Sequence, residues 1–153
     1  MEKIQMETLS SFIIEWAEEK NINNPQNQYL KIVEEIGETC GALLKGNKLE
    51  AIDGFGDIGV TIIIYAWQYN GDINFRRIRT LDNLDEVQSS DVSLLEHVFH
   101  ALYELSFTEA LFNVACLCFK HGFDFEHCLN AAWQVIKNRQ GKTVNGTFIK
   151  ESE

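Results

Sequence analysis

The sequence predicts an all-α protein, an antiparallel helical bundle formed by a single domain over residues 1–153. Three observations predict this fold class. Apolar residues recur at intervals of three and four, the chain contains one proline, and no segment shows sustained alternation of apolar and polar residues. A chain of 153 residues is long enough for one domain with a sizeable core.

The first two predicted helices are amphipathic. Leu9, Phe12, Ile13 and Trp16 share one face of a first helix. Asn24-Pro25 supplies an N-cap and a first-turn proline for a second helix over about residues 26–44, which ends at Lys45-Gly46. The expected inward face of the second helix consists of Leu30, Val33, Ile36, Gly37, Cys40 and Leu44.

A third helix is expected over about residues 49–69, closed by Asn70-Gly71. Its segment 58–67 is apolar nearly all round, which predicts burial within the bundle or in an oligomer. The apolar segment 112–119 of a later helix adds to this expectation. Together the two segments offer more apolar surface than one small bundle needs, so an oligomer is expected.

The middle of the chain has a weaker pattern. Residues 71–106 read as a connecting region, with a short helix around 81–87 and helical periodicity returning at 92–105. Ser106 and Glu109 resemble a capping box that opens a helix to about residue 120. Asp124 is the expected cap of a last helix over about residues 125–140. Residues 141–153 read as a polar tail, partly extended at 147–149.

Composition narrows the expected partners and compartment. The formal net charge of −10 argues against nucleic acid and anionic membranes as partners. The four cysteines have no zinc-site spacing and are expected to be reduced core residues. The N-terminus lacks a signal-peptide pattern, and the longest apolar run is too short for a bilayer, so a cytoplasmic location is expected.

Acidic residues cluster on the second and third helices. Glu34, Glu35 and Glu38 share one face with Lys31, a pattern that a solvated acidic face would also produce and that favours this interpretation when taken alone. Asp53 and Asp57 are four residues apart, on a stripe that continues into the apolar part of the third helix. A buried carboxylate costs several kcal/mol unless it is paired or bound to a metal.

Carboxylates without nearby His or Cys select a hard cation such as Mg²⁺. The chain has no Glu-x-x-His pair, which argues against a di-iron centre of the kind found in helical bundles. Gly54 and Gly56 lie among the acids of the third helix. They fit either space for a ligand or close packing against another helix, and the sequence leaves both interpretations open.

Glu34-Glu35-x-x-Glu38, a spacer, an acidic helix ending at Gly56-Asp57, and a basic segment from Lys137 to Lys142 occur in this order. With Trp16, Gln28-x-x-Lys31 and the segment 145–150, this pattern resembles the MazG-like all-α nucleoside triphosphate pyrophosphohydrolases, in particular the small phage and bacterial type. The resemblance covers about residues 12–67 and 123–150. It does not extend to the middle of the chain.

The resemblance implies hydrolysis of a nucleoside triphosphate to the monophosphate and pyrophosphate, in house-cleaning or control of nucleotide pools. It implies Mg²⁺, for which Mn²⁺ would substitute, and a homodimer or homotetramer. The implied metal ligands are Glu35, Glu38, Asp53 and Asp57. Glu34 would be a ligand or a base, so that the implied catalytic residues are Glu34, Glu35 and Glu38. The implied phosphate-binding cations are Lys31, Lys137, Arg139 and Lys142, and the candidates for contact with the base are Trp16 and either Asn27 or Gln28.

The chain departs from the family pattern at one acid. The family has Glu three residues before the position of Asp57, where this chain has Gly54. Asp53, on the same face as Asp57, is the preferred substitute, and Glu50-x-x-Asp53 one turn earlier is the alternative. Two other functions therefore stay open: a catalytically weak nucleotide-binding regulatory module, and a structural helical bundle with an acidic surface.

Overall fold

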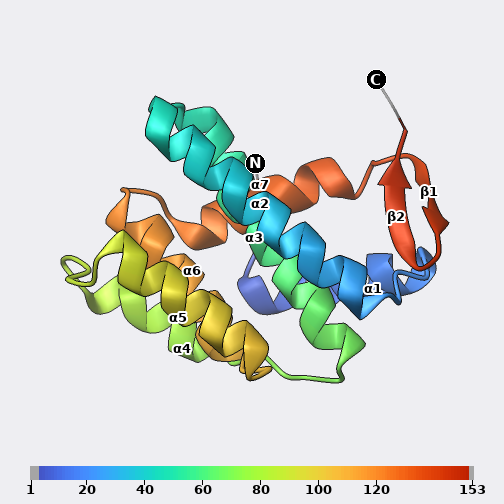
Figure 1. The fold of residues 1–153 in the computed structure, drawn as a ribbon, viewed down its shortest axis with the longest axis horizontal. Coiled ribbons are helices and arrows are strands. Elements are labelled where there is room, and N and C mark those ends of the chain that lie inside the picture. The colour runs from blue at the N-terminus through green and yellow to red at the C-terminus, as the bar shows by residue number, and fades with distance from the viewer. Residues whose placement is uncertain (1–3, 152–153) are drawn as a thin grey trace.

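The computed structural model describes residues 4–151, which are mostly helical, as the all-α prediction requires. Residues 1–3 and 152–153, the start of the N-terminal segment and the end of the polar tail, lie outside the described residues. Figure 1 shows the course of the chain. The elements are α1 (Met6–Glu19), α2 (Pro25–Lys45), α3 (Lys48–Gln68), α4 (Phe75–Arg79), the 3-10 helix η1 (Thr80–Asn83), α5 (Asp91–Tyr103), α6 (Phe107–Lys120), α7 (Phe125–Ile136), β1 (Gly141–Val144) and β2 (Thr147–Lys150).

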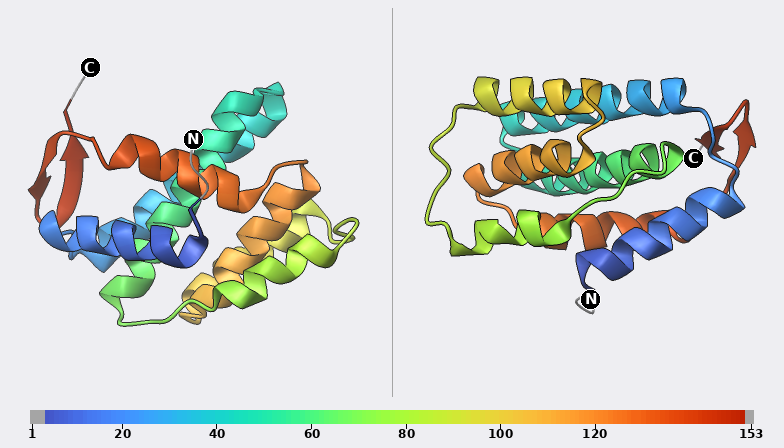
Figure 2. Two further views of the ribbon diagram at one scale, coloured as in Figure 1. Left: turned by 180° about the vertical axis from the view of Figure 1, so that it is seen from behind. Right: turned by 90° about the horizontal axis from the view of Figure 1, so that it is seen from below.

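The helices stack in three layers, which Figure 2 shows in its right-hand view. Helices α2 and α5 form one outer layer, α3 and α6 the middle layer, and α1, α4 and α7 the other outer layer. The two strands pair as an antiparallel hairpin beyond one end of the stack. None of the described helices is long and apolar enough to cross a membrane.

Helices α2 and α3 form an antiparallel pair because the chain reverses between them within two residues. The Asn24 side chain accepts a hydrogen bond from the Asn27 N–H at 3.1 Å, and Pro25 opens α2, as predicted. At the other end Gly46 has a φ of 69°, a left-handed conformation that glycine adopts without strain. Asn47 then caps α3 by accepting from the Glu50 N–H at 3.1 Å.

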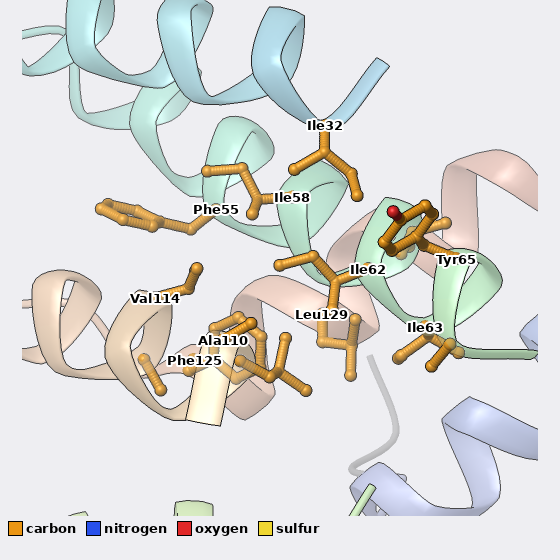
Figure 3. Packing of buried hydrophobic residues seen from close by; sticks show 14 of the residues in the cluster. Ile32, Phe55, Ile58, Ile62, Ile63, Tyr65, Ala110, Val114, Phe125 and Leu129 are labelled. Carbon is orange, nitrogen blue, oxygen red and sulfur yellow. The ribbon is translucent and has the colours of Figure 1, made fainter. Parts of the chain in front are cut away.

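Helix α3 is the centre of the core. It packs against α2 on one side and against α1, α6 and α7 on the others. Its residues from Ile58 to Ala66 are all buried by the chain itself (Figure 3). The predicted burial is confirmed, but it occurs within one chain, and α6 is buried in the same way from Val114 to Cys118. These two segments therefore give no support to the expected oligomer.

The predicted inward face of α2 is confirmed at Ile36, which is buried, and at Cys40, which packs partly buried against the core, but it is wrong at the other positions. The buried residues of α2 are Gln28, Ile32, Ile36, Thr39 and Ala42. By contrast Leu30, Val33 and Leu44 are 61%, 40% and 89% exposed. Gln28 and Thr39 can be buried because the donor group of each has an acceptor. The Gln28 amide donates to the Thr61 carbonyl on α3, and the Thr39 hydroxyl donates to the Glu35 carbonyl within α2. An apolar face of α2 is left outside.

The middle and the end of the chain also differ from prediction. The connecting region contains α4, η1 and α5. The short helix predicted around 81–87 is present only as the 3-10 turn η1, and residues 84–90 form no helix. Ser106 and Asp124 begin α6 and α7 without a side-chain cap bond. Helix α7 ends at Ile136, four residues before the predicted end. The chain then leaves the helix stack and enters the hairpin.

The predicted polar tail is a β-hairpin that is fixed to the rest of the molecule. Asn145 and Gly146 form its two-residue turn, with φ values of 51° and 76°. Asn-Gly is the sequence preferred for such turns because both residues tolerate positive φ. The Gly146 carbonyl accepts from the N–H groups of Asn23 and Asn24 at 3.1 and 3.3 Å. The Asn27 amide donates to the Thr147 hydroxyl oxygen at 2.8 Å.

Candidate functional site

A cavity of about 450 Å³ lies where the hairpin meets α1, α2 and α3. Four of the five predicted acids line it, and they come from both helices of the antiparallel pair: Glu34, Glu35, Glu38 and Asp57. Three cations line the same cavity: Lys31, Arg139 and Lys150. Residues more than 100 positions apart thus form one site that contains both signs of charge.

Close packing of α2 on α3 fixes the relative position of the acids. A Cβ atom at Gly54 would lie 2.3 Å from the Thr39 hydroxyl oxygen, so Gly54 faces α2 and not the cavity. A Cβ atom at Gly56 would lie 2.2 Å from the Cys128 carbonyl oxygen on α7. Both glycines therefore serve close helix packing rather than space for a ligand. No acidic side chain fits at position 54 unless α2 and α3 move apart.

Burial raises the pKa values of the two inner carboxyl groups, those of Glu35 and Asp57. Removal from water, together with the nearby charges of Asp57, Glu38 and Glu34, raises the pKa of Glu35 to about 7, and Lys31 opposes this shift. Removal from water likewise raises the pKa of Asp57 to about 6. Arg139 and Lys150 lower the pKa of Asp57, and Asp53 and Glu38 raise it. Ionising Glu35 and Asp57 therefore costs free energy because both are partly removed from water, and a bound cation would offset this cost.

The donor set fits a hard cation in its chemistry. The acids that line the cavity offer carboxylate oxygens, and none of the lining residues is a His or Cys. Within residues 4–151, however, no three acidic, His or Cys side chains already converge as a formed metal cluster. Glu34 and Glu38 are exposed at the cavity mouth, while Glu35 and Asp57 are half-buried. Binding would require the outer carboxylates to turn toward the inner pair.

Several predicted residues lie outside this cavity. Asp53 is exposed and does not line it, although its charge acts on Asp57. Lys137 and Lys142 are exposed and do not line it either. The cation missed in the prediction is Lys150. Recognising Asn145-Gly146 as a hairpin turn would have placed Phe148 and Lys150 together on one face of a strand.

The remaining wall of the cavity is apolar. Trp16 and Phe148 line it with their ring centroids 5.0 Å apart in an edge-to-face arrangement. Both rings are largely buried, so Trp16 combines the expected core packing with a place in the cavity wall. Val60 and Ile64 of α3 complete this side. The cavity is therefore charged at the α2–α3 acids and apolar toward α1.

Comparison with known proteins identifies one partial relative. No family model matches the chain, and no solved structure matches it significantly. A protein of Haemophilus phage HP1, described as an uncharacterized 18.2 kDa protein in the rep-hol intergenic region, is 36% identical over 77 residues. The match covers 48% of this chain and 47% of the phage protein. The chain thus matches about half the length of that relative.

Proposed function

We propose that this protein is an Mg²⁺-dependent nucleoside triphosphate pyrophosphohydrolase of the MazG-like all-α type, acting in house-cleaning or control of nucleotide pools. The observation that carries this proposal is that four carboxylates and three cations line one cavity. A triphosphate cannot approach carboxylates without a bridging cation, and it needs basic side chains for the charge that the cation leaves.

Each part of the cavity has a distinct role in the proposed reaction. Glu35, Glu38 and Asp57 would hold Mg²⁺, and Glu34 would orient the attacking water. Bound Mg²⁺ would neutralise phosphate charge and lower the pKa of water. Lys31, Arg139 and Lys150 bind the phosphates. Glu34 accepts a proton from the attacking water as the water oxygen bonds to the α-phosphorus, the bond from that phosphorus to the α–β bridging oxygen breaks, and pyrophosphate leaves with the electron pair of that bond.

The proposed reaction is tested by its products. Purified protein with Mg²⁺ and a panel of ribo- and deoxyribonucleoside triphosphates is expected to release pyrophosphate and the monophosphate. Glu38→Gln and Asp57→Asn are each expected to lower kcat/KM by at least about 100-fold, because each removes a charge from the proposed metal site. Direct detection of pyrophosphate and of orthophosphate gives the readout.

A matched control uses an acid outside the cavity. Glu96 is an exposed residue of α5 and does not line the site, so Glu96→Gln should leave the rate unchanged. Orthophosphate as the first product would contradict the reaction assignment. Equal losses in Glu96→Gln and Glu38→Gln would show that net charge, rather than the site, controls the rate.

A nucleotide-binding regulatory module is the second candidate. It is favoured by Gly54 at the position of the family acid and by the lack of a formed metal cluster among the described residues. Such a protein would be stabilised against thermal unfolding by Mg²⁺ and nucleotide together but would release no product. A helical bundle with a merely acidic surface would show neither effect.

The proposed enzyme forms a homodimer or homotetramer through the exposed apolar face of α2. This face carries the exposed Leu30, Val33 and Leu44. Helix α2 itself lies in an outer layer of the molecule (Figure 2). Cβ atoms at Gly37 and Gly41 would meet nothing within 4 Å, so packing within the chain does not require these glycines. A second copy of the chain would cover this apolar face of α2, which is exposed to water in the single chain.

A further inference from the structure

A buried amide lies in the cavity away from the acids. Gln28 is 4% exposed and lines the cavity. Its Nε2 donates a hydrogen bond to the main-chain oxygen of Thr61 on α3, at 3.1 Å. Because a carbonyl oxygen only accepts, this bond fixes the orientation of the amide group. The amide nitrogen faces the Thr61 carbonyl on α3. Because the amide group is planar, this also fixes the place of its oxygen.

The Gln28 oxygen has no hydrogen-bond donor among the described residues, although its side chain lines the cavity. It is not one of the fully enclosed oxygens that lack a partner in the described part of the chain. Gln68 provides the contrast. Its Nε2 donates to the Ile22 carbonyl at 3.1 Å, but its Oε1 is sealed inside the described part of the chain without a partner. Gln28 therefore presents a held acceptor to whatever occupies the cavity.

The amide and the acids lie at different levels along the α2–α3 pair. Seven residues of α2 separate Gln28 from Glu35, which is roughly 10 Å along the helix axis. On the antiparallel α3, Thr61 lies one turn beyond Asp57. Lys31, one turn along α2 from Gln28, and the apolar Trp16 and Ile64 line the same cavity. A buried acceptor oxygen repels phosphates, which carry further acceptor oxygens, and suits a flat group that carries a hydrogen-bond donor.

We propose that Gln28 determines base specificity by accepting a hydrogen bond from an exocyclic amino group, so that the cavity prefers cytosine and adenine nucleotides to their uracil and hypoxanthine counterparts. This inference rests on the proposed function. An oxo group in place of the amino group would set two acceptors against each other and leave both without a donor. The bond from Nε2 to Thr61 prevents the amide from turning over to supply one.

Two pairs of substrates test the proposal, because the members of each pair differ in the amino or oxo group. Wild-type kcat/KM for pyrophosphate release is expected to be about tenfold higher for dCTP than for dUTP, and for dATP than for dITP. Gln28→Met keeps the length and burial of the side chain without the amide. It should reduce both ratios below about twofold, and Gln26→Ala, exposed on the same helix, should leave them unchanged.

Equal wild-type rates within both pairs would overturn the proposal, as would a preference that survives in Gln28→Met. Thermal melts with dCMP, dUMP, dAMP and dIMP separate this failure from failure of the proposed function. Without any pyrophosphate release, the pyrophosphohydrolase proposal fails. Stabilisation by the amino-bearing monophosphates that is lost in Gln28→Met, and lost less in Gln28→Asn, still supports the role of Gln28. Equal melts with all four overturn it.

Discussion

Glu35 shows how one residue links burial to the conditions under which the protein is most stable. Its pKa of about 7 and that of Asp57, about 6, both lie above the usual values of 4.5 and 3.8. A group whose folded-state pKa is raised adds stability that is fully present below its unfolded pKa and is lost as the pH rises through the folded value. The metal-free protein should therefore lose stability between about pH 4 and pH 7.

This pH dependence is a testable prediction at the residue scale. Wild type and Glu35→Gln are expected to have similar Tm values near pH 4.5, and the variant should become the more stable of the two by pH 8, because it removes the buried charge. Melts without metal at several pH values give the measurement. Glu96→Gln is the control and should follow the wild-type curve. Parallel curves for wild type and Glu35→Gln would contradict the raised pKa.

At the scale of elements, the contact between α2 and α3 sets the geometry of the acids. Gly54 brings the two helices together at Thr39, whose hydroxyl is held by a 2.7 Å hydrogen bond to the Glu35 carbonyl. A larger residue at position 54 must displace the helix that carries Glu35 and Glu38. The departure from the family pattern at this position is thus a requirement of packing in this chain.

Gly54→Ala is therefore expected to lower the free energy of unfolding by about 1–3 kcal/mol, as overpacked core positions usually do. Gly37→Ala is the matched comparison for the dissociated chain, because within one chain its Cβ meets nothing within 4 Å and alanine favours the helix by about 0.5–1 kcal/mol. Gly37 lies on the proposed interface, so both variants are compared under conditions in which the protein is monomeric. Urea unfolding at one low protein concentration measures both. A neutral Gly54→Ala would show that α2 and α3 separate easily.

The helical elements could be predicted from the sequence because their periodicity and caps are local. Asn24-Pro25 and Gly46-Asn47 placed the ends of α2 and the start of α3 to within a residue or two. The inward face of α2 could not be predicted in this way. Apolar spacing pointed to Leu30, Val33 and Leu44, whereas α3 accepts Gln28 and Thr39, whose hydrogen bonds only the folded pair reveals.

The same limit applies to the candidate site. Asp57 was identified from its spacing on a single helix, and Glu35 from the order of acidic motifs along the chain; both are local features of the sequence. Lys150 was missed, and Lys137 and Lys142 were preferred to it, because the place of a cation beyond α7 depends on the hairpin. The hairpin depends on the Asn145-Gly146 turn and on bonds to residues 23–27. Contacts of this kind, between distant parts of the chain, produce no periodic pattern in the sequence.

At the scale of the whole molecule, the homodimer or homotetramer that we propose forms through the exposed apolar face of α2. Light scattering is expected to give the mass of a dimer or tetramer. The double variant Leu30→Glu/Val33→Glu should be monomeric and folded, because it places charges in the proposed interface. Val135 is 60% exposed on α7, so Val135→Glu is the control and should keep the assembly. A monomeric wild type would rule out the interface.

The hairpin has a consequence for the synthesis of this protein. Thr147 bonds to Asn27 across 120 residues of chain, a length that a ribosome adds in roughly 6–24 s. During that interval α2 and α3 can pair, yet the wall carrying Phe148 and Lys150 does not exist. A nascent chain therefore holds its acids on an open face of the α2–α3 pair, and the cavity is complete only when the hairpin emerges and docks beside α1.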